Sequence, residues 1–198
     1  MKLKIAGVKL NKRELDKAVG NSREFQKEAH RIAQRKMEEA KALMIQEFNL
    51  HPVTQELEMG GSASNISGTL GGYGNLFSFM GFSAGSKPTE EVRKFLKESI
   101  KLKTSSSKKT SKATKEFTIN TPTLDSFRFA SMPWESGNSW VKSVEKGMSS
   151  FSYFMHKAHE ASRSGMGIQI DNNIRNKSSA PTKYMSEILE KFRKRLSK

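Results

Sequence analysis

The sequence predicts an α+β protein in which one long N-terminal amphipathic helix and further helices pack with an antiparallel β-sheet that carries an extended basic loop. Three observations favour this class. Apolar residues recur at helical spacing over residues 21–57, glycine-rich stretches separate short segments of alternating apolar residues, and an acid-free lysine run divides two such segments. At 198 residues, the chain 1–198 has the length of a single domain.

The N-terminal part combines a short arm with the long helix. Residues 1–12 are predicted to form an N-terminal arm or strand. Asn21 can cap the helix that follows, with Glu24 three residues later as its reciprocal partner. Pro52 disfavours helical backbone at the residue before it, so the helix is expected to end near Asn49 or Leu50. Its predicted buried stripe comprises Phe25, Ala29, Ile32, Ala33, Met37, Ala40, Leu43, Met44 and Phe48.

The middle of the chain alternates between strand and helix signals. Glycine and serine dominate residues 62–85, which predicts two strands joined by a glycine turn. Pro88 opens a second helix, whose apolar stripe continues to Ile100. Residues 101–116 are predicted to form a hairpin with a long basic tip, or a mobile basic loop, because period-two apolar residues flank them. A further strand is expected over residues 124–130.

Helices also dominate the C-terminal part. Residues 137–161 predict a third helix, in which Gly147 can introduce a bend. A short strand is expected over residues 166–171. The last helix is predicted to begin at Pro181 and ends in a strongly basic segment.

The composition points to an acidic partner. The chain has 35 Lys and Arg against 20 Asp and Glu, a net charge of +15. Nucleic acid, an acidic protein surface and an acidic membrane can each explain this excess, and the membrane ranks last because no basic amphipathic helix carries aromatic anchors.

No apolar run approaches the ~18 residues of a membrane span, and the start lacks a signal peptide. The absence of cysteine excludes disulfides and thiol catalysis, and fits synthesis inside a cell.

Six lysines in the predicted hairpin are the candidates for contact with DNA. They alternate with Ser and Thr, and no acid lies between them. Lysines of this kind contact phosphates without reading bases, and the basic tail over residues 175–198 can add to them. The competing interpretation is a solvated charged loop. No helix-turn-helix, zinc finger or RNA-recognition motif indicates sequence-specific readout. The six are Lys101, Lys103, Lys108, Lys109, Lys112 and Lys115.

No catalytic, cofactor or metal site is predicted. Residues 81–85 match the G-x-S-x-G nucleophile elbow around Ser83, but the alternating strands and helices of that fold are missing, so a flexible turn is the better interpretation. His156 and His159 lie three residues apart on a predicted helix without an evident third metal ligand. The glycine-rich stretch lacks the Gly-Lys-Ser or Gly-Lys-Thr of a Walker loop.

The order of the elements resembles a family of phage proteins. A short N-terminal strand leads to a long amphipathic helix, then to Pro-Val-Thr-x-x-Leu, and then to glycine-punctuated strands and a hairpin. This layout is similar to the tail-completion or head–tail joining (neck) proteins of tailed bacteriophages, the minor tail component type. In that family the helix typically ends in a Pro-Val-Asp-Thr-Gly-x-Leu-like turn. Pro52, Val53, Thr54 and Leu57 match this turn, whereas the Asp is missing and Gln55 replaces the Gly.

The resemblance implies a non-enzymatic subunit of a ring, a hexamer, that joins the phage head connector to the tail tube or tail terminator around the DNA path. The expected location is the head–tail interface of the virion, after assembly in the host cytoplasm. Its partners would be other copies of itself, the neighbouring rings and packaged DNA without sequence specificity, and no membrane. The alternative is a basic, sequence-nonspecific nucleic-acid-binding protein, associated with ribosomes or the nucleoid.

Overall fold

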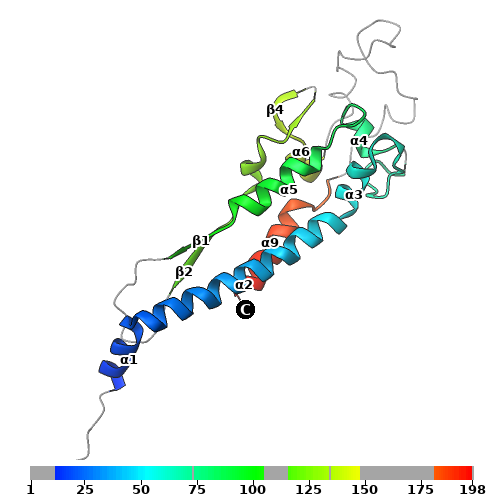
Figure 1. Cartoon of the computed structure of the whole chain (residues 1–198). Helices are drawn as coiled ribbons and strands as arrows, with labels where there is room; N and C mark the ends of the chain where they lie inside the picture. Colours follow the sequence, from blue (N-terminus) through cyan, green and yellow to red (C-terminus); the bar gives the residue numbers. More distant parts are fainter. Residues whose placement is uncertain (1–11, 73, 105–115, 134, 148–180, 198) are drawn as a thin grey trace, which may run out of the picture. The chain divides into compact units, whose positions relative to one another are not determined.

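The structure is a computed structural model, and its contacts divide the chain into two compact units. Unit 1 comprises Met1–Glu39 and Lys101–Asn120, and unit 2 comprises Ala40–Ile100 and Thr121–Lys198. Helices combine with two small antiparallel sheets, which agrees with the predicted α+β class (Figure 1). The residues that the structure describes are 12–72, 74–104, 116–133, 135–147 and 181–197. The predicted arm at residues 1–12 therefore falls almost entirely outside them.

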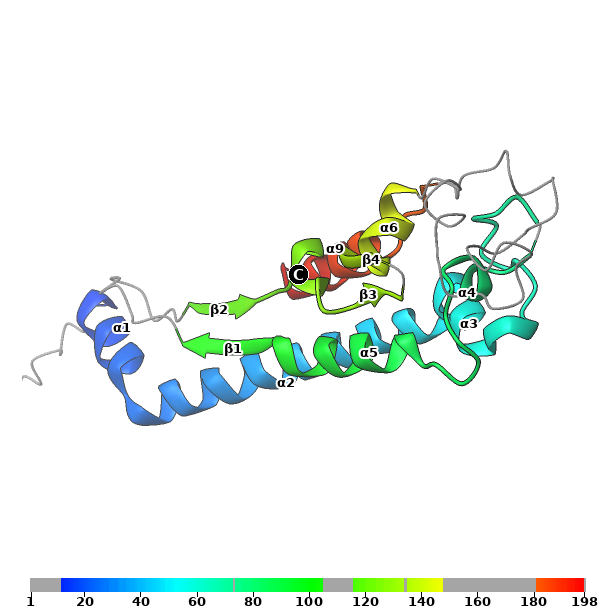
Figure 2. The same cartoon turned by 90° about the horizontal axis from the view of Figure 1, so that it is seen from above.

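Unit 1 contains a hairpin and two helical segments. Helix α1 spans Lys12–Asn21, and α2 spans Arg23–Leu50 and continues into unit 2. Strands β1 (Lys101–Thr104) and β2 (Phe117–Asn120) pair antiparallel, as the sequence predicts (Figure 2). The predicted basic tip between them, residues 105–115, lies outside the described residues.

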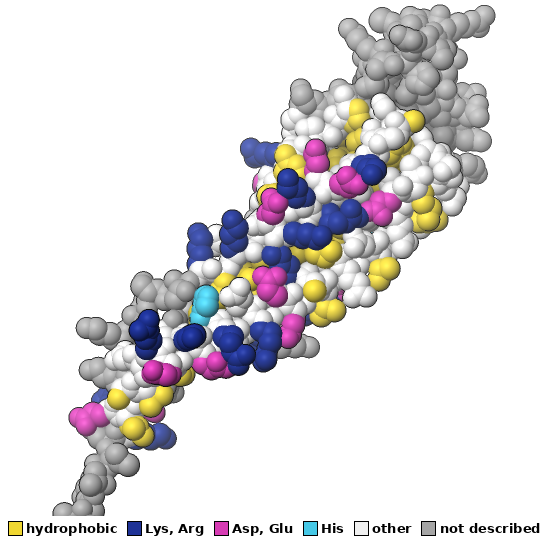
Figure 3. Space-filling model, viewed as in Figure 1, with side chains coloured by type: hydrophobic (Ala, Val, Ile, Leu, Met, Phe, Trp, Pro, Cys, Tyr) yellow, Lys and Arg dark blue, Asp and Glu magenta, His cyan; other side chains and the backbone are white. Residues whose placement is uncertain are grey.

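The contacts within unit 1 bury few side chains. The inner face of the hairpin is half-buried, and the ring of Phe117 lies 5.9 Å from the ring of His30 on α2. Met37 is the one fully buried hydrophobic residue among the described parts of this unit. Leu15 and Val19 on α1 are more than two-fifths exposed, and hydrophobic side chains are visible over α1 and α2 in Figure 3.

Helix α2 begins one residue later than predicted. Asn21 is the last residue of α1, because that helix continues through Gly20. Ser22 is the residue that caps α2: its Oγ accepts a hydrogen bond from the backbone N–H of Phe25 at 3.2 Å. The Asn21 cap was therefore the wrong prediction. The end of α2 at Leu50 lies where Pro52 predicts it.

Unit 2 contains the hydrophobic core. Large side chains from several helices fill it, among them Met44, Phe48, Leu57, Leu96, Trp140, Tyr184 and Phe192. After the end of α2, its elements are α3 (Pro52–Met59), η1 (Gly60–Ser62), α4 (Leu76–Phe79), α5 (Pro88–Ser99), η2 (Leu124–Phe127), β3 (Ser131–Met132), β4 (Glu135–Ser139), α6 (Trp140–Lys146) and α9 (Met185–Ser197). Helix α5 begins with the predicted Pro88 and buries Val92, Leu96 and Ile100.

The segment that matches the phage-family turn is a helix in this chain. His51 is extended, and its Nδ1 accepts a hydrogen bond from the backbone N–H of Val53 at 3.3 Å. Pro52 then occupies the first turn of α3, a position where a missing N–H is harmless. Val53, Thr54 and Leu57 are buried in this helix. The prediction of a turn over Pro52–Leu57 was therefore wrong.

The segment over residues 137–161 does not form the single helix that was predicted. Residues up to Ser139 belong to β4, which pairs antiparallel with β3. Helix α6 covers only Trp140–Lys146, and Gly147, with a φ of 81°, ends it rather than bending it. Residues 148–161 and the strand predicted over residues 166–171 lie outside the described residues.

The strand predicted over residues 124–130 is the 3-10 helix η2 and the turn after it. Thr123 and Ser126 cap η2 reciprocally, and the backbone N–H of Thr123 donates to Ser126 Oγ at 3.1 Å. Such local side-chain bonds compete with strand pairing. The apolar residue Phe127 is nevertheless buried, which explains the strand-like pattern.

The last helix begins four residues later than Pro181. The carboxylate of Glu145, from α6, accepts hydrogen bonds from the backbone N–H groups of Tyr184 at 3.2 Å and Ser186 at 2.6 Å. It also accepts one from the Ser186 hydroxyl at 2.7 Å. A carboxylate in this position satisfies free N–H groups at the positive end of the helix dipole. The start of α9 at Met185 thus depends on a residue far away in the sequence.

The two strands predicted over residues 62–85 do not form among the described residues of this range, and a buried carboxylate organises the segment instead. Glu56 of α3 is fully buried. Its oxygens accept hydrogen bonds from Asn65 Nδ2 at 2.9 Å, from the N–H of Ser67 at 2.9 Å and from the N–H of Leu76 at 2.6 Å. The glycine-rich segment is therefore held by a side chain rather than by strand pairing.

Asn65 extends this arrangement. Its Oδ1 accepts hydrogen bonds from the N–H groups of Leu70 at 3.0 Å and Gly72 at 3.2 Å. Gly71 and Gly72 have φ angles of 66° and 89°, which glycine adopts without strain. The side chains of Glu56 and Asn65 thus accept backbone N–H groups that a neighbouring strand would bind in a sheet.

Replacement of Glu56 by Ala is expected to destabilise the protein by about 3 kcal/mol or more, because one buried and two partly buried donors lose this acceptor. Glu56→Gln keeps one acceptor oxygen and is expected to lose less. Urea denaturation measures both. Gln55→Ala on the same helix is the control and should change the free energy of unfolding by less than about 1 kcal/mol. Equal losses for Gln55→Ala and Glu56→Ala would contradict the role of Glu56.

Candidate functional site

The exposed face of the β1–β2 hairpin is the described part of the predicted DNA-contacting region. Lys101 and Lys103 are exposed on β1, and they stand opposite Asn120 and Thr118 on β2. Side chains two residues apart in a strand share one face, so these four residues form a single surface, which we call the hairpin face. Ammonium, amide and hydroxyl groups are all donors that proteins use to contact phosphates.

The two lysines of the hairpin face are free of acidic partners. Neither Lys101 nor Lys103 forms an ion pair with another residue in the described ranges. The other four candidates, Lys108, Lys109, Lys112 and Lys115, lie outside these ranges. In the sequence they continue the run without an acid. The hairpin face is therefore a positively charged surface that the described residues of its unit do not neutralise.

The basic C-terminal helix differs from the hairpin in this respect. Lys191 and Lys194 on α9 each pair at 2.7 Å with a glutamate one turn earlier. Arg195 binds both oxygens of Glu47 on α2, one of them at 2.9 Å. Arg193 donates to a backbone carbonyl just before η2 at 3.1 Å. The described cations of α9 therefore bind partners within unit 2, and the tail contributes less free charge than the sequence predicts.

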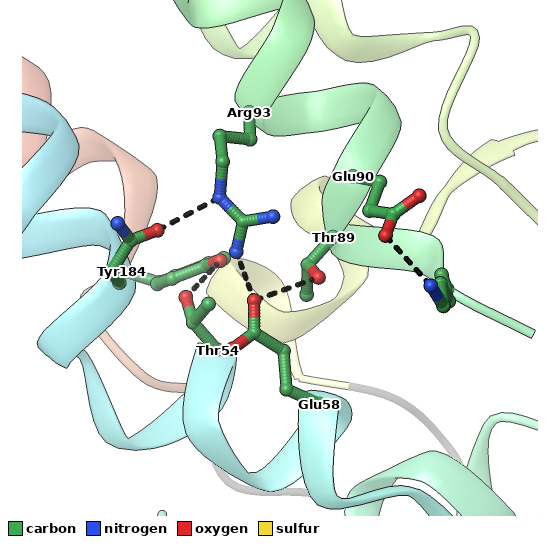
Figure 4. A network of polar contacts seen from close by, with 8 residues as sticks. Thr54, Glu58, Thr89, Glu90, Arg93 and Tyr184 are labelled. Carbon is green, nitrogen blue, oxygen red and sulfur yellow. Dashed lines mark hydrogen bonds and ion pairs between the residues drawn. The ribbon is translucent and has the colours of Figure 1, made fainter.

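A second group of polar side chains joins three helices of unit 2 (Figure 4). Arg93 of α5 donates from Nε to Asn49 Oδ1 on α2 at 2.9 Å, and its guanidinium pairs with Glu58 of α3. Thr89 donates to the same Glu58 oxygen at 3.1 Å. The guanidinium also lies 5.8 Å from the centre of the Phe48 ring. These bonds connect α2, α3 and α5, so the group has a structural role.

A buried hydroxyl pair lies beside this group. The hydroxyls of Thr54 and Tyr184 are 2.8 Å apart, and both residues are fully buried. Burial raises the pKa of Tyr184 far above its usual range, so the phenol stays protonated at neutral pH. A phenol held in this form connects α3 to the start of α9 and does not act as a base.

Two grooves open next to these residues. The smaller has a volume of about 290 Å³ and lies between α3 and α5, and the larger, of about 390 Å³, is lined by Phe82, Phe129 and Trp140 among others. The charged side chains of the smaller groove pair with one another: Glu58 with Arg93, and Lys87 with Glu90 at 3.1 Å. The arrangement offers packing and charge neutralisation rather than a reactive group.

The sequence motifs for catalysis and metal binding gain no support from the geometry. Ser83 lies in an exposed turn that follows helix α4, whereas a nucleophile elbow follows a strand. His156 and His159 lie outside the described residues. Within the part of the chain that the structure describes, no group of three or more His, Asp or Glu could hold a metal ion. None of its helices there is long and apolar enough to cross a membrane.

Sequence reasoning missed Glu56, the acid that organises the glycine-rich segment. A signal for it was present, because Glu56 follows Val53 by three residues and precedes Leu57 by one. That spacing places the carboxylate on the apolar face of a helix, where an acid needs several donors. The sequence does not indicate the partners of Arg93 and Glu145 in this way, because those partners belong to elements far away in the chain.

His51 gives unit 2 a dependence on pH. Its neutral Nδ1 accepts the N–H of Val53, and its ring lies 4.7 Å from the ring of Tyr184. Burial lowers the pKa of His51 below the 6.5 of an unfolded histidine, against opposing effects of the Lys183 backbone and Glu187. The unfolded state therefore binds the proton first as the pH falls. This contribution to stability is complete above about pH 6.5 and is lost below it.

The variant His51→Asn is expected to weaken this pH dependence, because Asn can accept the Val53 N–H and does not titrate. Urea denaturation at pH 7 and pH 5 should show a smaller loss of stability for the variant than for the wild type. Carboxylates titrate in both proteins, so the difference between them isolates His51. Equal losses in the two proteins would show that His51 is not responsible.

Comparisons with known proteins do not extend this description. No protein-family model, curated protein or solved structure matches the chain. Its function must therefore be argued from the hairpin face, the charge distribution and the order of the elements.

Proposed function

We propose that the chain is a structural subunit of a neck or tail-completion ring at the head–tail joint of a tailed bacteriophage. In this proposal six copies surround the DNA path between the head connector and the tail tube or tail terminator. The subunit assembles in the host cytoplasm, resides in the virion and catalyses no reaction. The resemblance in the order of elements supports the choice of this class.

The observation that carries the proposal is the unpaired positive charge of the hairpin face. Lys101 and Lys103 are exposed without an acidic partner in the described ranges, and four more lysines follow before the next acid in the sequence. A channel that holds DNA of any sequence needs positive charge without base-specific groups. The hairpin face and the basic tip, residues 105–115, meet this requirement, and we assign them to the lumen of the ring.

The distribution of the remaining charge supports the same assignment. Three of the four described cations of α9 form ion pairs within unit 2, as do Arg93 and Lys142, which pairs with Asp125 at 2.7 Å. The hairpin segment differs from these elements because its six lysines, from Lys101 to Lys115, follow one another without an acid between them in the sequence. A localised basic element on a folded body suits a subunit that presents one surface to DNA.

The native mass of the purified chain tests the ring. We expect an oligomer near six subunits that persists at high salt, because contacts between ring subunits depend on apolar burial more than on screened charges. Light scattering coupled to size exclusion, over a series of salt and protein concentrations, measures it. A chain that stays monomeric at every concentration would argue against the ring.

The hairpin lysines are tested by the salt dependence of DNA binding. For Lys101→Gln/Lys103→Gln we expect the slope of log K against log salt to fall in magnitude by about 1–2, since each lost phosphate contact on duplex DNA removes about 0.9. Fluorescence anisotropy with a labelled duplex measures the slope. Lys146→Gln/Lys183→Gln removes the same charge at exposed positions of unit 2 and serves as the control. Equal slopes for the two variants would contradict a role of the hairpin face.

The alternative is a basic, sequence-nonspecific nucleic-acid-binding protein of the ribosome or nucleoid. The same unpaired lysines favour it, because they require no assembly to bind phosphates. The two proposals differ in valency. A free binder binds as a monomer at full strength, whereas a ring gains affinity when several hairpins act together.

A further inference from the structure

Strand β1 has an outer edge that can accept another strand. Its sheet has two strands, and among the described residues β1 pairs only with β2. Apart from this ladder, no backbone hydrogen bond between described residues reaches Lys101–Thr104. In an edge strand, every second residue directs its N–H and C=O groups away from its partner, where a further strand can bind them.

The inner face of the hairpin is incompletely buried. Leu102 on β1 is half-buried, as are Phe117 and Ile119 on β2. A hairpin of two strands is marginally stable in water by itself. Unit 1 fully buries only Met37 among its described hydrophobic residues. A third strand with apolar side chains on the inner face would therefore add burial to this unit.

The N-terminal arm contains a segment with the pattern of β1. Residues 2–5, Lys-Leu-Lys-Ile, alternate basic and apolar side chains, as residues 101–103, Lys-Leu-Lys, do on β1. The segment is as long as β1, which has four residues. As a strand, it would direct both lysines to one face and both apolar side chains to the other. Ala6 and Gly7 interrupt the alternation, so the match ends at Ile5.

The connection to α1 indicates which chain supplies this strand and in which direction it runs. Residues 1–11 lie outside the described residues and lead into α1, which begins at Lys12 in the same unit as the hairpin. Both views of the fold draw α1 at the end of the hairpin where β1 ends and β2 begins (Figures 1 and 2). The seven residue steps from Ile5 to Lys12 extend to about 24 Å. Such a tether raises the local concentration of the arm at its own β1, and an arm that returns to α1 at this end runs parallel to β1.

We propose that residues 2–5 add to the outer edge of β1 of the same chain as a parallel third strand. Leu3 then lies beside Leu102 on the inner face. The two lysines of the segment join Lys101 and Lys103 on the hairpin face, which gains positive charge. The contact of these added lysines with DNA rests on the proposed function, whereas the pairing of the strand does not.

The lysines make this pairing depend on salt. Like charges on neighbouring strands destabilise a sheet. Because salt screens exposed charges, the arm should pair more strongly at high salt than at low salt. Phosphates of bound DNA would neutralise the same lysines, so DNA binding and pairing of the arm would strengthen each other. An acidic strand on this edge would show the opposite dependence on salt.

Hydrogen exchange of the β1 backbone amides tests the proposal in the full chain without DNA. Leu3→Ser/Ile5→Ser removes the apolar side of the segment without a change of charge. At high salt we expect the outward amides of β1 to exchange roughly tenfold or more faster in this variant than in the wild type, because the third strand no longer binds them. NMR measures the rates, and the amides of α5 should keep their wild-type rates if the fold is intact.

The matched control changes the arm outside the segment. Val8→Ser/Leu10→Ser makes the same substitutions after Gly7 and should leave the β1 amides with their wild-type exchange rates. Equal rates in the wild type and Leu3→Ser/Ile5→Ser would overturn the inference. Equal acceleration in the two variants would overturn the assignment to residues 2–5.

A mixture identifies the chain that supplies the strand. Isotopically labelled Leu3→Ser/Ile5→Ser is combined with an excess of unlabelled wild type, and the exchange of the labelled β1 amides is measured. A strand from the same chain leaves these amides in fast exchange. Slow exchange in the mixture would show that another copy supplies the arm, and it would overturn the pairing within one chain.

The exchange experiment can fail independently of the proposed function. Unchanged exchange in Leu3→Ser/Ile5→Ser would overturn the third strand, while an oligomer near six subunits and a salt slope that depends on the hairpin lysines would still support the ring. A monomer whose hairpin lysines leave the slope unchanged would overturn the proposed function, while accelerated exchange in the variant would still support the third strand.

Discussion

The buried carboxylate of Glu56 is the constraint on which the glycine-rich half of unit 2 depends. It lies on α3 among apolar side chains, where a carboxylate without donors would be strongly destabilising. Asn65, Ser67 and Leu76 supply those donors, the last of them with the first N–H of α4. Asn75 then caps α4 and donates to the carbonyl of Gly61 at 2.9 Å. One acid thereby determines the path of a segment that has no strand or long helix of its own.

The rest of unit 2 is joined by polar side chains between helices. Arg93 links α5 to α2 and α3, Tyr184 links α9 to α3, and Glu145 links α6 to α9. Because these bonds cross elements far apart in the sequence, they fix the helices relative to one another within the unit more specifically than apolar contact alone. In unit 1 a side-chain hydrogen bond joins α2 to α1, from Gln26 Nε2 to the carbonyl of Gly20 at 2.6 Å.

Periodicity and proline predicted the helices well, and polar interactions explain the failures. The helix α2 and the Pro88 start of α5 could be predicted because both follow from local sequence. The buried stripe predicted for α2 was wrong at Ile32 and Leu43, which are 48% and 46% exposed. The hairpin could be predicted because the apolar residues Leu102, Phe117 and Ile119 alternate with polar residues. Residues 62–85 were misjudged because a distant carboxylate replaces strand pairing there. The start of α9 was misjudged because its capping residue, Glu145, comes from α6. Of the candidate site, the lysines could be predicted from composition, whereas the neutralisation of the basic tail depends on tertiary contacts.

The antiparallel register of β1 and β2 leaves the length of the segment between them free to vary. Thr104 pairs with Phe117, so the two ends of the segment are fixed by the ladder whatever lies between. The entropy of closing a flexible loop grows only slowly with length, by about 0.6 kcal/mol for each doubling. Insertions and deletions between these residues would therefore change the number of lysines, and with it the reach and charge of the tip, at little loss of stability. Selection can tune this element almost independently of the body that carries it.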